Sequence, residues 1–191
     1  MTIRELIEKN RSYRRFQEDA EVEPETLKEL VDLARLSASA ANLQPLKYVL
    51  SWEPRKNGLI FEHLGWAAYL KDWKGPEQGQ RPSAYVIILG DTSISKTFGC
   101  DHGIAAQSIL LGAVERGLGG CMIASIQRGH LKEALDIPAR FEILLVIALG
   151  RPREEVVVEE LKPGEGVEYW RDERGVHHVP KRGLEDIILT P

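Results

Sequence analysis

The sequence predicts an α+β fold in which a few buried strands are separated by amphipathic helices. Two continuous apolar runs, residues 84–89 and 143–149, are rich in β-branched side chains and predict strands buried on both faces. Residues 101–116 are apolar over most of a helical surface, which predicts a central, buried helix. The 191 residues predict a single domain over 1–191, since domains hold roughly 100–200 residues.

Local signals place the other elements. Thr2 and Glu5 have the capping-box spacing, which predicts a short N-terminal helix. Pro24 is placed as the first residue of a second helix, with an apolar face. Pro45 disfavours a helical conformation before it, so residues 47–52 are expected to form a strand.

In the second half of the chain, Asp101 is expected to cap the central helix and Gly117 to end it in a left-handed conformation. Residues 121–123 then predict a short strand, and residues 128–135 predict a short helix.

Two segments are less regular. Residues 53–82 have the least regular residue pattern of the chain, and within them residues 59–70 have a helical pattern. The tail, about 153–191, is polar and expected to be loop-like. A tail with few apolar residues buries little by itself, so it is expected to pack on a folded surface, such as a partner subunit.

The composition is that of an ordinary globular protein. The chain is 43% hydrophobic and 28% charged, with a formal net charge of −4 and a pI near 5.8, so nucleic acid is not an expected partner. No apolar run approaches the roughly 20 residues needed to span a bilayer, and the N-terminus lacks the apolar core of a signal peptide. Cys100 and Cys121 are expected to be reduced thiols, so a cytoplasmic location is expected.

Several familiar motifs are not supported. The glycines of residues 117–120 follow a predicted helix and precede a predicted strand, the reverse of a dinucleotide-binding loop. The histidines have no spacing typical of a metal site, so no metal is expected. There is no Walker A sequence and no Gly-x-Ser-x-Gly motif. Arg81 follows a Gly- and Gln-rich loop and is interpreted as a surface residue.

Residues 10–16, Asn-Arg-Ser-Tyr-Arg-Arg-Phe, are the main candidate for a binding site. Three guanidinium groups and a hydroxyl lie within five residues, and arginine suits phosphate and other oxyanions. A solvated basic turn is the alternative interpretation. Lys181 and Arg182 form a second basic pair near the other end of the chain.

Four segments, in order and spacing, resemble the nitroreductase family of FMN-dependent oxidoreductases. Residues 10–16 correspond to the family pattern Arg-Arg-Ser-x-Arg-x-Phe, and residues 37–46 to Ser-Pro-Ser-x-x-Asn-x-Gln-Pro-Trp. Residues 117–123 correspond to its Gly-Leu-Gly turn and following strand, and residues 181–185 to its closing basic pair. The resemblance therefore covers nearly the whole chain.

The resemblance implies an intertwined homodimer with a central mixed or antiparallel sheet flanked by helices, and FMN at the subunit interface. It also implies that the FMN phosphate is bound by Arg11, Ser12, Lys181 and Arg182. A phosphate monoester carries about −1.5 to −2 charges at neutral pH, so an acidic protein needs local cations to hold it.

The same resemblance implies contacts to the flavin ring. Arg14 would approach the pyrimidine side, where a cation stabilises the negative charge that develops on reduction. Three polar residues would reach the flavin from the other subunit: Ser39, Asn42 and Gln44. The backbone near flavin N5 would come from Ile123, Ala124 and Ser125. No acid–base side chain is expected, because the cofactor carries the chemistry.

The activity implied is hydride transfer from NADH or NADPH through flavin N5 to a nitroaromatic or quinone-like acceptor, with ping-pong kinetics. The nicotinamide preference and the acceptor stay open. Specialised family chemistry (dehalogenation, desaturation or fragmentation of the flavin), an FMN-storage module without turnover, and a non-flavin protein for another phosphorylated ligand are the alternatives.

The chain also departs from the family pattern. Asn10 replaces the first arginine, which weakens the phosphate site unless Arg15 or the tail compensates, and Ala38 and Leu46 replace proline and tryptophan. Residues 54–82 lie where the family varies the lid over the flavin. Four of their side chains could line such a lid or serve ordinary packing: Trp66, Tyr69, Trp73 and Arg81.

Overall fold

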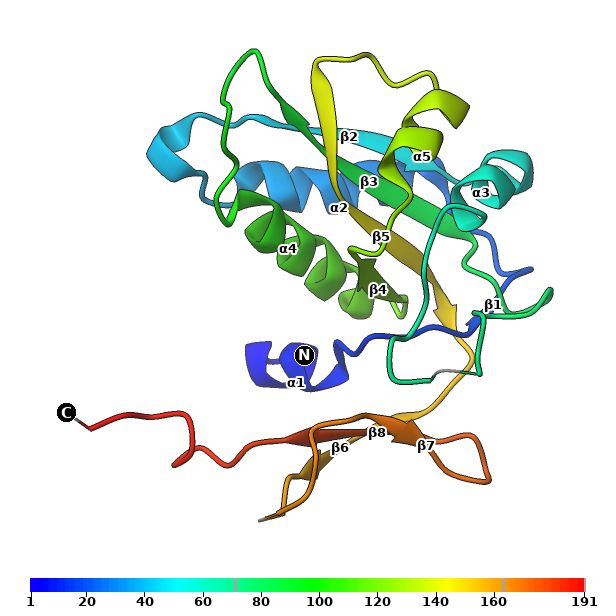
Figure 1. Ribbon diagram of the computed structural model, residues 1–191, viewed down its shortest axis with the longest axis vertical. Helices are drawn as coiled ribbons and strands as arrows, with labels where there is room; N and C mark the ends of the chain where they lie inside the picture. The colour runs from blue at the N-terminus through cyan, green and yellow to red at the C-terminus, as the bar shows by residue number, and fades with distance from the viewer. Residues whose placement is uncertain (71, 163, 191) are drawn as a thin grey trace.

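The computed structural model describes residues 1–70, 72–162 and 164–190. Its centre is a five-stranded antiparallel sheet (Figure 1). The long strand β5 (Phe141–Pro152) pairs with β3 (Ala84–Asp91) along one edge, and with β4 (Gly119–Ile123) and β1 (Phe16–Gln17) along the other. Strand β2 (Leu46–Ser51) completes the sheet beyond β3. The chain therefore has the α+β class expected from its sequence.

Helices cover both faces of this sheet. Helices α2 (Pro24–Leu36) and α4 (Asp101–Glu115) share one core with alternate residues of β3, including Val86 and Ile88. Helices α3 (Pro54–Phe61) and α5 (Arg128–Ala134) share the other core with Tyr85 and Ile87. All eight residues of β3 are buried, which confirms the prediction of a strand with two apolar faces.

The local sequence signals are mostly confirmed. Helix α1 (Ile3–Lys9) has the full capping box, in which the Glu5 amide donates to the Thr2 hydroxyl and the Thr2 amide donates to the Glu5 carboxylate. Pro24 begins α2, and Gly117 follows α4 with φ +72°. Helix α4 is buried on one side only, since Ile104 is 37% exposed. The prediction of a buried helix is therefore confirmed for one face of α4 only.

Two local predictions are wrong. Residues 59–70 do not form a helix, because α3 ends at Phe61; Leu64 instead forms a β-bridge with Ile126, and the Gly65 amide donates to the Ser125 carbonyl at 2.8 Å. These partners are distant in sequence. Pairing with them requires an extended backbone, so the helix does not continue beyond Phe61.

Asp101 does not cap α4 either. Cys100 occupies the N-cap position, and Asp101 is the first helical residue. Its carboxylate accepts hydrogen bonds from the segment after α2, at Ser39 and Ala40, and so is not available to the amides of its own helix.

The tail is not loop-like. It contains a three-stranded sheet in which β8 (His177–Lys181) lies between β6 (Val156–Glu160), parallel to it, and β7 (Trp170–Arg171), antiparallel to it. Its strands carry the charged residues Glu159, Glu160, Arg171 and Lys181, and the Trp170 and His178 rings stack with centroids 4.1 Å apart. A sheet with so much charge shows little alternation of apolar and polar residues, which explains the wrong prediction.

Within these described ranges, no helix has both the length and the apolarity needed to cross a membrane.

Gly120 allows β4 to pack against α4. A Cβ atom there would lie 2.6 Å from the Ala148 carbonyl oxygen and 2.6 Å from a methyl carbon of Leu110. We expect Gly120→Ala to lower the free energy of unfolding by about 1–3 kcal/mol, because the crowded position forces the strand to shift. Gly129→Ala in α5 is the control, with no atom within 4 Å of its added Cβ. Equal stability of both variants in urea denaturation would refute the close approach.

Candidate functional site

The N-terminal basic loop, residues 10–15, lies beside β4. Ser12 forms a parallel β-bridge with Gly120, and the Tyr13 amide donates to the Gly120 carbonyl at 3.0 Å. Ile123 is three residues further along β4, about 10 Å away at 3.3 Å per residue. The structure therefore brings Arg11, Ser12 and Arg14 to the strand that leads to residues 123–125. Ile123 is buried there, whereas Ala124 and Ser125 are exposed.

The arginines of this loop keep unused donors. Arg11 is half-buried, and one of its terminal nitrogens donates to the Ile7 carbonyl. The Nε atoms of Arg11 and Arg15 are buried, and each lacks a hydrogen-bond acceptor among the described residues. Since a buried donor without a partner is costly, an oxyanion at this loop would be stabilised by both guanidinium groups. The residues present therefore fit a phosphate.

Asn10 does not take the place of the missing arginine. It is the C-cap residue of α1, and its side-chain amide donates to Gln107 of α4 at 3.4 Å. Arg15 is the residue with a spare buried donor, so compensation by Arg15 is the alternative that the geometry favours.

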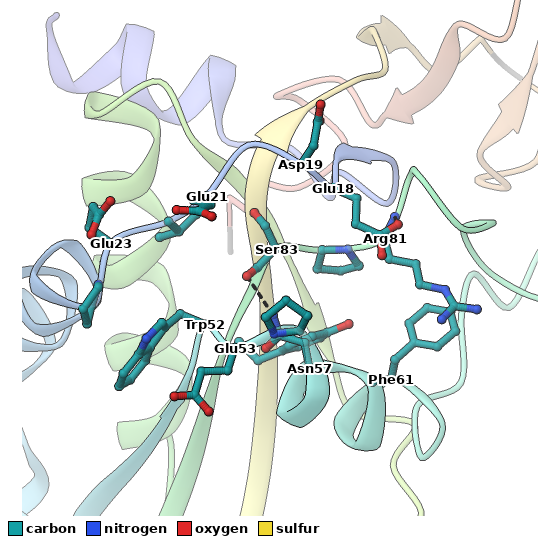
Figure 2. Close-up of a pocket in the computed structure, with 16 residues that line it drawn as sticks. Glu18, Asp19, Glu21, Glu23, Trp52, Glu53, Asn57, Phe61, Arg81 and Ser83 are labelled. Carbon is teal, nitrogen blue, oxygen red and sulfur yellow. Dashed lines mark hydrogen bonds between the residues drawn. The ribbon is translucent and has the colours of Figure 1, made fainter.

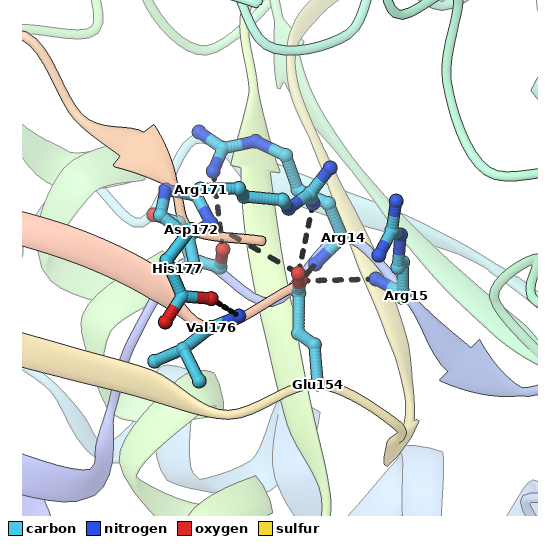
Figure 3. Close-up of polar contacts among 8 residues, drawn as sticks. Arg14, Arg15, Glu154, Arg171, Asp172, Val176 and His177 are labelled. Carbon is cyan, nitrogen blue, oxygen red and sulfur yellow. Dashed lines mark hydrogen bonds and ion pairs between the residues drawn. The ribbon is translucent and has the colours of Figure 1, made fainter. Parts of the chain in front are cut away.

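Glu154 holds the basic loop in place (Figure 3). Its carboxylate accepts hydrogen bonds from the backbone amides of Arg14 and Arg15 and forms an ion pair of 2.8 Å with Arg171 of β7. The side chain of Glu154 is 1% exposed and that of Arg171 is 11% exposed. A charge-assisted network this deeply buried joins the loop to the C-terminal sheet of the same chain.

Aromatic rings surround the same cluster. The Arg14 guanidinium lies 4.8 Å from the centroid of Tyr169, and the Arg171 guanidinium lies 4.5 Å from that of Trp73. Tyr69 packs edge-on against Tyr169 with centroids 5.0 Å apart, and Trp66 packs against Trp73. The aromatic residues of segment 66–73 thus contact the arginine cluster and the C-terminal sheet.

Arg81 is not a simple surface residue. It is half-buried, and its guanidinium lies 4.3 Å from the centroid of Phe61 at the end of α3. Its sequence context, a polar loop, gave no sign of this aromatic neighbour.

His177 is the buried titratable group of this network. Its side chain is 1% exposed and 3.9 Å from Glu154, and neither ring nitrogen has a hydrogen-bond partner among the residues described. Burial lowers the pKa of His177 from 6.5 to about 4, aided by Arg14 and Arg171 and opposed by Glu154. The imidazole is therefore neutral at pH 7.

We expect this histidine to destabilise the fold in acid. Between pH 6.5 and about 4 the unfolded chain binds a proton at His177 that the folded chain does not, so stability falls as pH falls. The full loss is about 3 kcal/mol. Denaturation midpoints at several pH values, compared with those of His177→Phe, measure it. An identical pH dependence in both proteins would contradict the buried, neutral imidazole.

The second candidate group lies after α2. Ala41, Asn42 and Gln44 have positive φ angles of 50°, 55° and 51°, although none is glycine. The Ser39 hydroxyl donates to Asp101 at 2.6 Å and accepts from the Gln44 amide at 2.9 Å. Asn42 and Gln44 are exposed, with their side chains 3.2 Å apart. Strained backbone anchored in this way is typical of a functional site.

The two groups lie apart within one chain. Ser39, Asn42 and Gln44 follow α2 in the chain. Figure 1 shows the C-terminal end of α2 on the opposite side of the molecule from β1. Lys181 and Arg182, at and after the end of β8, are exposed, and their side chains form no hydrogen bond or ion pair with the described residues. Figure 1 shows the C-terminal sheet on the same side of the molecule as α1 and the basic loop.

Sequence reasoning missed the acidic residues that build the site. Glu154 lies in a polar stretch whose sequence predicts a loop, and the sequence around Asp101 predicts a helix cap. The one available signal was the need of three clustered arginines for a counter-charge, but it could not indicate which of the many acidic residues supplies it.

Comparisons with known proteins agree with this fold. The sequence is 25% identical to the 5,6-dimethylbenzimidazole synthase of Rhodospirillum rubrum over 180 residues. This alignment covers 82% of this chain and 85% of the relative. The nitroreductase family protein of Streptococcus pneumoniae TIGR4 superposes with a TM-score of 0.71 over 100% of both chains, at 19% identity. The NADPH:FMN oxidoreductase of Vibrio harveyi, solved with NAD+, has a TM-score of 0.61 at 21% identity over 78% of this chain and 68% of its own. The model of the Nitroreductase family matches residues 7–151, and this chain belongs to that family.

Proposed function

We propose that this protein is an FMN-dependent oxidoreductase that passes hydride from NADH or NADPH to a small organic acceptor, a nitroaromatic or a quinone. The observation that carries the proposal is the pair of buried Nε atoms on Arg11 and Arg15, next to β4, which have no acceptor among the described residues, in a chain of the nitroreductase family. The similar structure from Vibrio harveyi is that of an NADPH:FMN oxidoreductase, which supports the same two cofactors.

Each candidate residue then has a role in this chain. Arg11 and Ser12 would bind the phosphate, with Lys181 and Arg182 closing the site from the tail. Arg14, held by Glu154 and Tyr169, would place a fixed positive charge at the pyrimidine side of the ring. FMN, when bound, supplies two-electron chemistry at N5 in a ping-pong cycle, and the backbone of residues 123–125 would orient it there.

A homodimer would complete the site. In the single chain Ile3 and Ile7 of α1 and Ile104 of α4 are exposed by 63%, 47% and 37%. Burying such residues against a second copy would be favourable. The strained loop that carries Ser39, Asn42 and Gln44 would then reach the partner's flavin, and we propose that residues from about 153 onward also contact the partner.

One anaerobic titration tests the proposal. The purified protein is expected to be yellow, and addition of NADH or NADPH is expected to bleach its flavin absorbance. A colourless protein that does not take up FMN would indicate another phosphorylated ligand. A yellow protein that neither nucleotide bleaches would be a storage module, and the proposed activity would be wrong.

The similarity to 5,6-dimethylbenzimidazole synthase favours a second candidate, a specialised breakdown of the flavin itself. Incubation of the protein with FMN and a reductant in air, followed by mass spectrometry for 5,6-dimethylbenzimidazole, tests it. Formation of that product in proportion to the protein would replace the acceptor reaction as the main activity.

Arg14→Ala is expected to slow flavin reduction about 10²-fold, because one preorganised charge at the reacting group is lost. The retention of FMN should change much less. Stopped-flow reduction and equilibrium FMN binding measure the two effects separately. The reverse outcome, weak binding with a normal reduction rate, would reassign Arg14 to the phosphate.

A further inference from the structure

One cavity lies away from the residues predicted to contact FMN. It has a volume of about 600 Å³ and opens between the start of α2, the end of β2, α3 and the start of β3 (Figure 2). Of the flavin candidates named above, only Arg81, one of the four candidates for the lid, lines it. Ser39 follows the other end of α2, a helix of 13 residues and thus about 20 Å long. The volume is in the range of small-molecule sites, about 300–1,000 Å³.

Carboxylates dominate the charge around this cavity. Five acidic residues line it, together with one arginine: Glu18, Asp19, Glu21, Glu23, Glu53 and Arg81. Glu18 accepts hydrogen bonds from the backbone amides of Gly79 and Arg81. The other four carboxylates are exposed, and no described residue donates to them or forms an ion pair with them. Their mutual repulsion would be relieved by a bound cation.

The cavity is arranged for an organic cation and not for a metal ion. In residues 1–70, 72–162 and 164–190, no three metal-ligating side chains come close enough together to hold a metal. Figure 2 shows Glu21 and Glu23 on one side of the opening, with Trp52 and Glu53 on the other. Trp52 is 40% exposed, and the face of an indole attracts a cation.

The inner wall combines apolar surface with two hydroxyl groups and the buried Asn57 amide, which is already hydrogen-bonded to Ser51 and Ser83. Val22, Pro54 and Phe61 supply hydrophobic surface. Tyr85 and Ser83 are 0% and 7% exposed, and neither hydroxyl has a hydrogen-bond partner among the described residues. Burial raises the pKa of Tyr85, so its hydroxyl keeps its proton and can both donate and accept. A buried hydroxyl without a partner in the wall of a cavity is a binding group for a polar atom of a ligand.

We propose that this cavity binds a small organic cation, a protonated amine joined to a ring-sized apolar body that carries a polar group. The amine would lie at the opening, between Glu21 and Glu53 and against Trp52. The body would pack against Phe61 and Pro54, and its polar group would reach Tyr85. The Arg81 guanidinium, on the far wall beside Phe61, disfavours placing the positive end of the ligand inside.

Calorimetric titration of the FMN-saturated protein with tyramine tests the proposal. Tyramine has an amine, an aromatic ring and a hydroxyl group. Tyrosol has a hydroxyl group in place of the amine, and 4-hydroxyphenylacetate has a carboxylate there. We expect tyramine to bind at least about tenfold more tightly than tyrosol, the equivalent of about 1.4 kcal/mol, and the acid not to bind. No binding of tyramine, or equal binding of tyrosol, would overturn the proposal.

Variants locate the binding in this cavity. Glu21→Gln/Glu53→Gln is expected to weaken the binding of tyramine at least about tenfold and to leave the binding of tyrosol unchanged, because only the amine of tyramine is charged. Glu133→Gln removes an exposed carboxylate of α5, outside the cavity, and is expected to change the affinity for neither tyramine nor tyrosol. Tyr85→Phe removes a hydroxyl that has no partner, so the protein should stay as stable while tyramine binds more weakly. Unchanged tyramine affinity in both cavity variants would refute the assignment. Because no readout uses flavin reduction, the result is independent of the proposed activity.

Discussion

Lys181→Ala/Arg182→Ala is expected to lose its FMN during gel filtration. Both side chains are exposed, and no described residue pairs with either, so their charges are free to bind a ligand. A phosphate carries about −1.5 to −2 charges, and each hydrogen bond to it contributes about 1.5–3 kcal/mol. Loss of two such contacts should raise the dissociation constant of FMN about 10²–10⁴-fold. The ratio of flavin to protein absorbance in the eluted peak measures retention.

A charge-matched control separates this contact from net charge. Arg55→Ala/Lys96→Ala removes two exposed cations whose side chains form no hydrogen bond or ion pair with the residues that the structure describes. Its FMN content is expected to equal that of the wild-type protein, and the affinity of the wild-type protein should fall with rising salt. Full occupancy in Lys181→Ala/Arg182→Ala would remove the tail from the site and leave Arg11 and Arg15 as the phosphate ligands.

Glu154→Ala is expected to destabilise the protein by about 3–5 kcal/mol, the cost of breaking a buried ion pair. The variant leaves the Arg171 guanidinium without its carboxylate and the amides of Arg14 and Arg15 without their acceptor. FMN affinity should fall as well, because the basic loop is no longer held beside the C-terminal sheet. Urea denaturation, followed by FMN binding to the folded protein, measures both effects.

Two further variants test the reason for that loss. Glu155→Ala changes the neighbouring, exposed glutamate and is expected to shift the free energy of unfolding by less than about 0.5 kcal/mol. Glu154→Ala/Arg171→Met removes both charges and should recover part of the lost stability. If the second substitution restores nothing, the buried pair is not the source of the effect.

Much of the fold could be predicted from single stretches of sequence. Strands β3 and β5 are buried on both faces, so their residues must be almost all apolar, and that pattern is visible without a structure. The capping box at Thr2 and the turn at Gly117 depend on neighbouring residues only. The end of α3 depends on pairing of Leu64 and Gly65 with residues 125–126, which no local pattern reveals.

The candidate site divides in the same way. The chemical type of the ligand could be inferred from the arginines at 11, 14 and 15 and from the basic pair at 181–182, because guanidinium and ammonium groups suit a phosphate wherever the chain places them. The positions of Arg14 and Arg15 depend on Glu154, which in the sequence is one more acid in a polar tail. The loop at Ser39 likewise depends on Asp101, 62 residues away.

The sequence by itself determined the core strands and the helix boundaries that neighbours control, and it predicts a phosphate-bearing ligand. Only the tertiary structure decided which acids hold the basic loop and the Ser39 loop, and where α3 ends. It also decided that the tail forms a sheet and that an acid-lined cavity exists. The reason is physical: apolar burial and capping leave their pattern in adjacent residues, whereas a charged group chooses its partner by distance in space, among many equivalent residues along the chain.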